Sequence, residues 1–219
     1  MKILAIETSG PTCAVAVGSW RIPPRTLAAA LAAMRVVGRT GPESFTRHSD
    51  TLFGLLTAVL GRRGLVGITG IAVSLGPGSF TGLRIGLAAA KTFARFGRIP
   101  LVGVPTLAAM AAGVSGARWL VPSLDALRGE VYAAVYRPGP RGPWLTGGPW
   151  VITPQDLAAR TPRGALPVTG QPRAALVAAL GAVRLATGRP ADPDRLVPLY
   201  LRRPAAAEKR RSAPRSRPA

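Results

Sequence analysis

The 219-residue sequence has very few of the residues that build metal centres and disulfide frameworks. It contains one cysteine, Cys13, and one histidine, His48. A disulfide scaffold, a cysteine-built zinc site and a histidine-rich metal centre are therefore excluded for this chain acting alone. Cys13 stands within an apolar run without a basic neighbour, so we interpret it as a buried structural thiol rather than a nucleophile. We accordingly predict no metal and no cofactor.

Acidic residues and lysines are also scarce. Nine Asp and Glu residues stand against 29 Lys and Arg, only three of them lysines, which gives a formal net charge of +20. Such an excess is typical of nucleic-acid-binding proteins, yet here the arginines are scattered and only residues 201–219 concentrate charge. This tail either contacts nucleic-acid phosphates or is a disordered end without function. The body shows no interleaving of aromatic and basic residues, which disfavours a plain RNA-binding module.

The start of the chain lacks a long hydrophobic run. Four apolar residues stand between Lys2 and Glu7, far short of a signal-peptide core or a membrane span. We therefore expect a cytoplasmic protein without membrane contact. Because 47% of the residues are hydrophobic and 17% are charged, the chain can bury the core of one compact domain or two small ones.

Short apolar runs alternate with helical patterns, which predicts an α/β fold. Strands are predicted at 3–6 and 13–17 as a hairpin, with an enlarged connection over 18–43 that holds a helix and a third strand at 34–37. A helix follows from an N-cap at Ser44, and a strand, a helix ending near Gly97 and another strand complete the first half. The second half is predicted to contain a hairpin of strands at 119–124 and 131–136, a loop at 138–149, and helices starting at Thr153 and spanning 173–180.

A glycine-rich turn joins the strand predicted at 68–74 to the next helix. A helix that begins after such a turn suits a phosphate, because its first backbone N–H groups lack partners. The spacing matches neither a Walker A loop nor a dinucleotide fingerprint, so a tight structural turn is the alternative. Glu7, in the first hairpin turn, either approaches phosphate and metal or is a solvated turn acid. The candidate phosphate-loop residues are Glu7, Thr8, Gly76, Gly78 and Ser79.

Three stretches, residues 3–9, 76–86 and 125–132, together with a short signature at 198–202, resemble the bacterial TsaB family. The resemblance implies an actin-like ATPase (ASKHA) fold of two small lobes, the second of them shortened. The lobes would cover 1–105 and 106–197, followed by a C-terminal segment and basic tail at 198–219. It further implies an inactive relative of TsaD without catalytic residues, in which the phosphate loop is vestigial.

By resemblance, the protein is a non-catalytic scaffold that binds and stabilises TsaD. That complex forms N6-threonylcarbamoyladenosine at adenosine 37 of tRNA, with a TsaE-like ATPase in the larger assembly. Contact with tRNA would be indirect or through the basic tail. The alternative function is an ATP-binding actin-like phosphotransferase acting on its own, although no adenosine loop is recognisable between 138 and 197.

The resemblance also implies that helices of the first lobe contact TsaD. The alternative for each apolar position is an ordinary place in the core. The same faces would serve a homodimer when TsaD is absent. The interface residues implied in this way are His48, Thr51, Leu52, Leu55, Leu83, Arg84 and Leu87.

Overall fold

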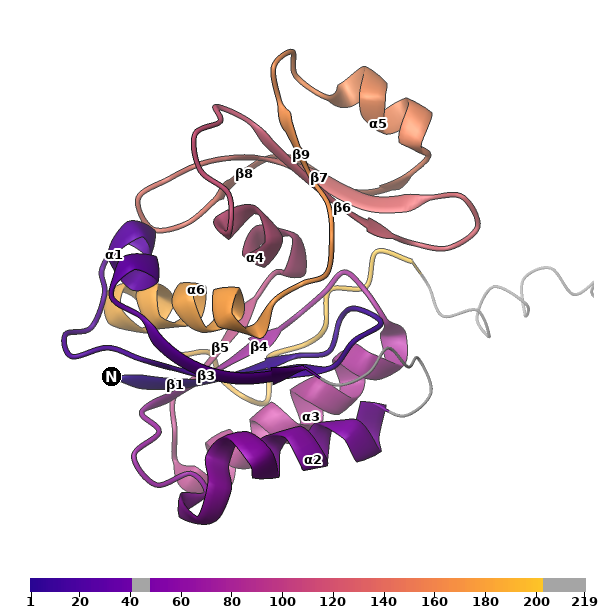
Figure 1. Cartoon of the computed structure of the whole chain (residues 1–219). Helices are drawn as coiled ribbons and strands as arrows, with labels where there is room; N and C mark the ends of the chain where they lie inside the picture. Colours follow the sequence, from indigo (N-terminus) through magenta and orange to yellow (C-terminus); the bar gives the residue numbers. More distant parts are fainter. Residues whose placement is uncertain (41–47, 203–219) are drawn as a thin grey trace, which may run out of the picture.

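Two β-sheets lie one above the other, with helices below the first sheet and between the two (Figure 1). The computed structural model describes residues 1–40 and 48–202. The elements of the first half are β1 (Lys2–Glu7), β2 (Ala14–Ser19), α1 (Leu27–Ala32), β3 (Arg35–Thr40), α2 (His48–Leu60), a short 3-10 turn η1 (Gly61–Arg63), β4 (Gly70–Ser74), α3 (Phe80–Gly97) and β5 (Leu101–Val104). Those of the second half are α4 (Thr106–Ala112), β6 (Leu120–Asp125), β7 (Val131–Arg137), β8 (Trp144–Ile152), α5 (Pro154–Arg160), β9 (Leu166–Val168) and α6 (Ala174–Thr187).

The first sheet has the strand order β3-β2-β1-β4-β5. β1, β2 and β3 pair in antiparallel fashion, and β4 and β5 continue from β1 in parallel. The predicted first hairpin and third strand are confirmed, and the connection between β2 and β3 contains α1. Trp20 closes that connection, because its indole Nε1–H donates to the Ala30 carbonyl at 2.8 Å. The predicted N-cap Ser44 lies outside the described residues.

Helices cover both faces of the first sheet. α2 and α3 pack below it over Leu4, Ile6 and Val73, whereas α6 packs above it on β1, β2 and β4 (Figure 1). α6 approaches closely because a side chain at Gly181 would overlap the Ala72 methyl. The first sheet thus takes its upper cover from residues 174–187, beyond the boundary at 105 that we predicted for the first lobe.

The second sheet has the order β8-β7-β6-β9, and α4 lies between it and α6. The β6–β7 hairpin is confirmed, and so is α5, where the Thr153 side chain caps the helix and Pro154 opens it. The predicted loop at 138–149 is wrong from Trp144 onward, because β8 begins there. Its pairing with β7 shifts register beside Gly147, so no regular alternation marks it in the sequence.

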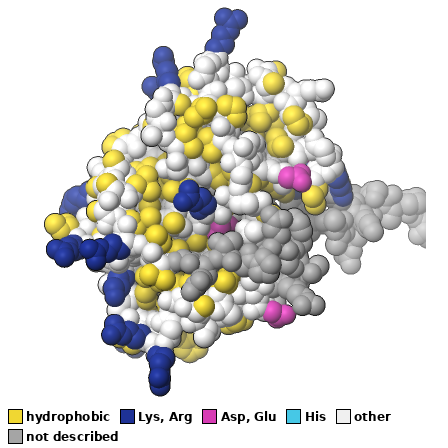
Figure 2. Space-filling view, in the orientation of Figure 1, with side chains coloured by type: hydrophobic (Ala, Val, Ile, Leu, Met, Phe, Trp, Pro, Cys, Tyr) yellow, Lys and Arg dark blue, Asp and Glu magenta, His cyan; other side chains and the backbone are white. Residues whose placement is uncertain are grey.

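One continuous core joins the two sheets. Ile3, Ala72 and Val102 of the first sheet share it with Leu120 and Tyr136 of the second, through α4 and α6. On the outside, Lys and Arg side chains are spread around the visible face and acidic ones are few (Figure 2). Within residues 1–40 and 48–202, no helix is both long and apolar enough to cross a membrane. The cytoplasmic location stays a prediction.

Candidate functional site

The turn after β1 buries a carboxylate. Glu7 is 1% exposed, and the Ser9 backbone N–H donates to its Oε1 at 2.6 Å, joined by the Ser9 hydroxyl. Burial raises the pKa of the Glu7 carboxyl, while hydrogen bonds from Ser9 and Ser74 lower it in part. Glu7 Oε2 has no hydrogen-bond partner among the described residues. The interpretation of Glu7 as a solvated turn acid is therefore wrong.

The start of α3 lies directly against this turn. Ser79 caps the helix, since its side chain accepts from the Gly82 N–H at 3.1 Å, and the Ser79 N–H donates to the Ser9 carbonyl at 2.7 Å. A side chain at Gly78 would overlap Ser9, and one at Gly82 would overlap the Thr8 carbonyl oxygen. Two of the amides that were expected to face a phosphate are thus satisfied within the chain. The arrangement supports the alternative interpretation of this sequence as a structural turn.

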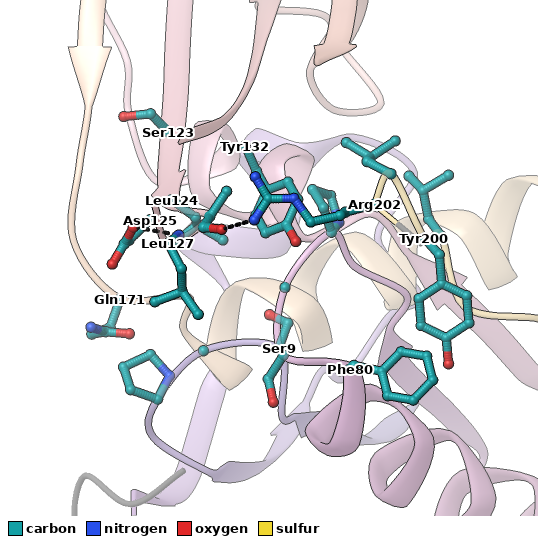
Figure 3. Close-up of a pocket in the computed structure, with 18 of the residues that line it drawn as sticks. Ser9, Phe80, Ser123, Leu124, Asp125, Leu127, Tyr132, Gln171, Tyr200 and Arg202 are labelled. Atoms are coloured by element: carbon teal, nitrogen blue, oxygen red, sulfur yellow. Dashed lines mark hydrogen bonds between the residues drawn. The ribbon is translucent and has the colours of Figure 1, made fainter. Parts of the chain in front are cut away.

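A C-terminal segment, residues 198–202, runs from the first lobe to the second. The Leu199 N–H donates to the Leu75 carbonyl at 2.7 Å, and the Tyr200 hydroxyl accepts from Arg84 Nε at 3.2 Å. The Tyr200 ring also lies 4.9 Å from the Phe80 ring, between centroids. Figure 3 shows these two rings side by side at one edge of the site. The segment is therefore attached by its backbone to the loop after β4 and by the Tyr200 side chain to α3.

At its other end the segment reaches the β6–β7 turn. Arg202, labelled in Figure 3, donates from one guanidinium nitrogen to the Ala126 carbonyl at 2.6 Å and pairs through the other with Glu130. Leu127 and Arg128, in that turn, have positive φ angles of 62° and 59°. The Leu127 N–H donates to Asp125 Oδ1 at 2.7 Å, which supports this conformation. Arg202 consequently joins the second lobe to the segment.

These parts enclose a cleft of about 810 Å³ between the lobes. Among the described residues, Ser9 reaches the cleft from the first turn, and Glu7 lies behind it. The charged side chains that line it are Asp125, Arg128 and Arg202. No group of three or more His, Cys, Asp or Glu that could hold a metal ion occurs in the described ranges. Of the charged side chains that line the cleft, Arg202 is already paired with Glu130, and on the first-lobe wall the Ser79 and Gly82 amides are already bonded within the chain.

The predicted interface residues fall into three groups. Leu52, Leu83 and Leu87 are 0%, 1% and 5% exposed and pack in this chain's own interior, which favours the core alternative for all three. Thr51 and Leu55 are half-buried on α2, and Arg84 is exposed on α3 but engaged with Tyr200 and Phe80. His48 is the first residue of α2, and its side chain lies outside what the structure describes.

Sequence reasoning missed the contribution of Phe80 and Tyr200 to the site. Phe80 lies in the glycine-rich motif and Tyr200 in the C-terminal signature, so each belongs to a stretch that the sequence analysis identifies. Because the two residues are far apart along the chain, nothing in the sequence indicates that their rings are in contact.

Two stacked sheets with covering helices and a cleft between the lobes define a class, the actin-like ATPase fold, and the chain has that fold. The matching family model is described as "TsaD: tRNA N6-adenosine threonylcarbamoyltransferase" and covers residues 38–144. The tRNA threonylcarbamoyladenosine biosynthesis protein TsaB of Escherichia coli is 34% identical over 66% of this chain and 58% of its own length. An uncharacterized Mycobacterium bovis protein is 37% identical over 72% of this chain and 76% of its own.

The solved structure of YeaZ from Pseudomonas aeruginosa agrees with the fold. It superimposes with a TM-score of 0.73 at 24% identity and covers 91% of this chain and 99% of that one. The chain belongs to the TsaB family. The matched part of the chain spans just over half the length of the Escherichia coli relative.

Proposed function

We propose that this chain is a non-catalytic subunit that binds and stabilises a TsaD-like enzyme in the formation of N6-threonylcarbamoyladenosine at adenosine 37 of tRNA. The observation that carries the proposal is the turn after β1, where the Ser9 carbonyl accepts from the Ser79 N–H at 2.7 Å. Phosphate binding at a helix start uses free backbone amides, and this bond, with that from Gly82 to Ser79, leaves fewer of them at the start of α3. The name of the Escherichia coli relative supports the same pathway.

The partner would dock on the outer surface of α2 and α3, below the first sheet. On this surface Leu55 of α2 and Ile85, Ala89 and Phe93 of α3 are half-buried and pack only partly against the core. Phe96, near the end of α3, is 87% exposed. Half-buried apolar side chains on two adjacent helices are suited to a helix bundle shared with a second chain. Of the predicted interface residues, Thr51 and Leu55 therefore remain in the proposed interface. Ile85, Ala89 and Phe93 take the place of the buried Leu83 and Leu87.

Other partners follow from the same proposal. A TsaE-like ATPase would join the assembly through the enzyme, and a homodimer would use the α2–α3 surface when the enzyme is absent. Contact with tRNA through the basic tail concerns residues that lie outside the described ranges.

The test is a titration of the full chain with its TsaD-like partner. Phe96→Glu should weaken association at least tenfold, because a charge would be buried against the partner. The fold should persist, since Phe96 is mostly exposed. Ile22→Glu is the matched control, because Ile22 is 80% exposed in the loop between β2 and α1. Equal affinities for Phe96→Glu and the unmodified chain would remove this surface from the proposal.

The second candidate function is an ATP-dependent phosphotransferase, which the size of the interlobe cleft favours. Calorimetric titration of the isolated chain with Mg-ATP separates the two. If the isolated chain binds Mg-ATP tightly and Ser79→Ala abolishes that binding, the phosphotransferase replaces the scaffold as the proposed function. No binding of Mg-ATP, together with binding of the TsaD-like chain, supports the scaffold.

A further inference from the structure

The face of the second sheet that points away from α4 carries tryptophan and arginine side chains. On β7, Ala134 and Tyr136 point inward to the core, so Ala133, Val135 and Arg137 lie on the opposite face, where Ala133 and Val135 are themselves buried and Arg137 is exposed. Residues directly opposite each other in an antiparallel pair share a face. Trp150 is opposite Ala133, and Trp144 is opposite Arg137. Both indoles therefore stand on the outer face with Arg137.

A third tryptophan completes this outer surface. Trp119 directly precedes Leu120, which is opposite the inward Tyr136, so its indole points outward. The Arg137 guanidinium lies 5.1 Å from the centre of the Trp119 ring, which confirms the placement. Because β7 lies between β6 and β8, Arg137 stands between Trp119 on one neighbouring strand and Trp144 on the other.

Guanidinium groups lie over the indoles at three places. Arg118 is 5.9 Å and Arg137 5.1 Å from the Trp119 ring centre, and Arg160 of α5 is 5.4 Å from that of Trp150. These distances are within the range of cation–π attraction. Trp144 is 73% exposed and is the most exposed tryptophan among the described residues. We refer to Trp119, Trp144, Trp150, Arg118, Arg137 and Arg160 as the Trp–Arg face.

The charge around this face is mostly positive. Between residues 131 and 173 the sequence holds five arginines and a single carboxylate, Asp156 of α5. Arg141, Arg163 and Arg173 add exposed positive charge in the loops on either side of the sheet and α5. A docking protein would have to supply most of the counter-charge itself, and a lipid surface would not use the flat faces of the rings. Alternating guanidinium groups and indoles match a ligand that alternates phosphates and planar bases.

We propose that the Trp–Arg face binds unpaired nucleotides of RNA, with arginines on the phosphates and indoles or guanidinium planes stacked on the bases. Base stacking on aromatic side chains tolerates any sequence, and the arginines add salt-dependent affinity. The binding is a property of this chain alone. That the RNA is a tRNA loop rests on the proposed function. The sequence does not reveal this surface, because the residues of the Trp–Arg face come from four separate segments. Only the folding of β6, β7, β8 and α5 brings them together.

The experiment measures fluorescence anisotropy of a labelled 15-nucleotide single-stranded RNA and of unmodified tRNA with the full chain, at two salt concentrations. Trp144→Ala should weaken binding about tenfold through lost stacking. Arg137→Glu should weaken it by about as much and flatten the dependence on salt. Arg62→Glu, which changes the charge equally on the exposed turn η1, should leave the affinity nearly unchanged.

Three outcomes overturn the inference. The first is no RNA binding by the unmodified chain, and the second is the same affinity for Trp144→Ala as for the unmodified chain. The third is an equal loss for Arg62→Glu, which would indicate charge without a defined site. Circular dichroism of each variant verifies the fold. Titration of Trp144→Ala with the TsaD-like partner separates the two proposals, because that association should be unchanged whether or not RNA binding is lost.

Discussion

On the first-lobe wall of the cleft, the turn after β1 meets α3 through backbone atoms, with Gly78 and Gly82 leaving no room for a side chain. On the second-lobe wall, the β6–β7 turn is held by side-chain bonds from Arg202. Close backbone contact tolerates no added atom, whereas a hydrogen-bonded arginine can release and reform its contacts. We therefore expect any adjustment of the cleft to a ligand or partner to occur on the second-lobe wall.

The largest effect is expected at the contact between Thr8 and Gly82. Gly82→Ala places a methyl group on the Thr8 carbonyl oxygen, so we expect a loss of about 3 kcal/mol or more in the free energy of unfolding. Urea denaturation measures it. Gly54→Ala on α2 is the matched control, because its added methyl meets nothing within 4 Å and should stabilise the helix by about 0.5–1 kcal/mol. If Gly82→Ala and Gly54→Ala changed the free energy of unfolding by similar amounts, the first-lobe wall would not be the tightly packed one.

A second test uses the buried carboxyl on the first-lobe wall. Burial raises the pKa of Glu7 in the folded protein above its unfolded value, near 4.3. The folded state therefore favours the protonated form, and stability is lost as pH rises from the unfolded to the folded pKa. Glu7→Gln should remove this loss, so its stability relative to the unmodified chain should improve between pH 4 and pH 8. Parallel profiles from urea denaturation across this range would show that Glu7 does not carry the pH dependence.

The smallest effect is expected on the second-lobe wall. Arg202→Ala removes one charge-assisted pair and one bond to a carbonyl, both partly exposed, so the expected cost is about 1–2 kcal/mol. Thermal unfolding should report a decrease of only a few degrees in Tm. Arg202→Lys, which keeps the charge but not both contacts, should fall between. A cost as large as that of Gly82→Ala would mean that the two walls are equally rigid.

The sequence predicted the first sheet better than the second. β1, β4 and β5 of the first sheet are continuous apolar runs, and α3 repeats apolar residues at helical spacing. β8 contains Gly147, Gly148 and Pro149, which are typical of a loop. All seven residues of α4 are buried, so it shows no polar face and no period.

The sequence identified the first-lobe members of the site, Glu7 and the glycines, but neither Phe80 and Tyr200 nor the arginines of the second-lobe wall. It also did not show that the turn following Glu7 packs against α3, more than seventy residues further along the chain. Separation along the sequence is also the reason why the contact between Phe80 and Tyr200 and the assembly of the Trp–Arg face were not predicted. Local patterns determine which residues are unusual, and the tertiary fold determines which of them meet.

The origin of α6 bears on how the chain folds during synthesis. Because α6 supplies the upper cover of the first sheet, that sheet keeps an apolar face open until residues 174–187 have emerged. Contacts between segments so far apart slow folding, since the intervening chain must close before they form. The first lobe is therefore not an independent folding unit, and the nascent protein would stay exposed to aggregation until almost the whole described chain has left the ribosome.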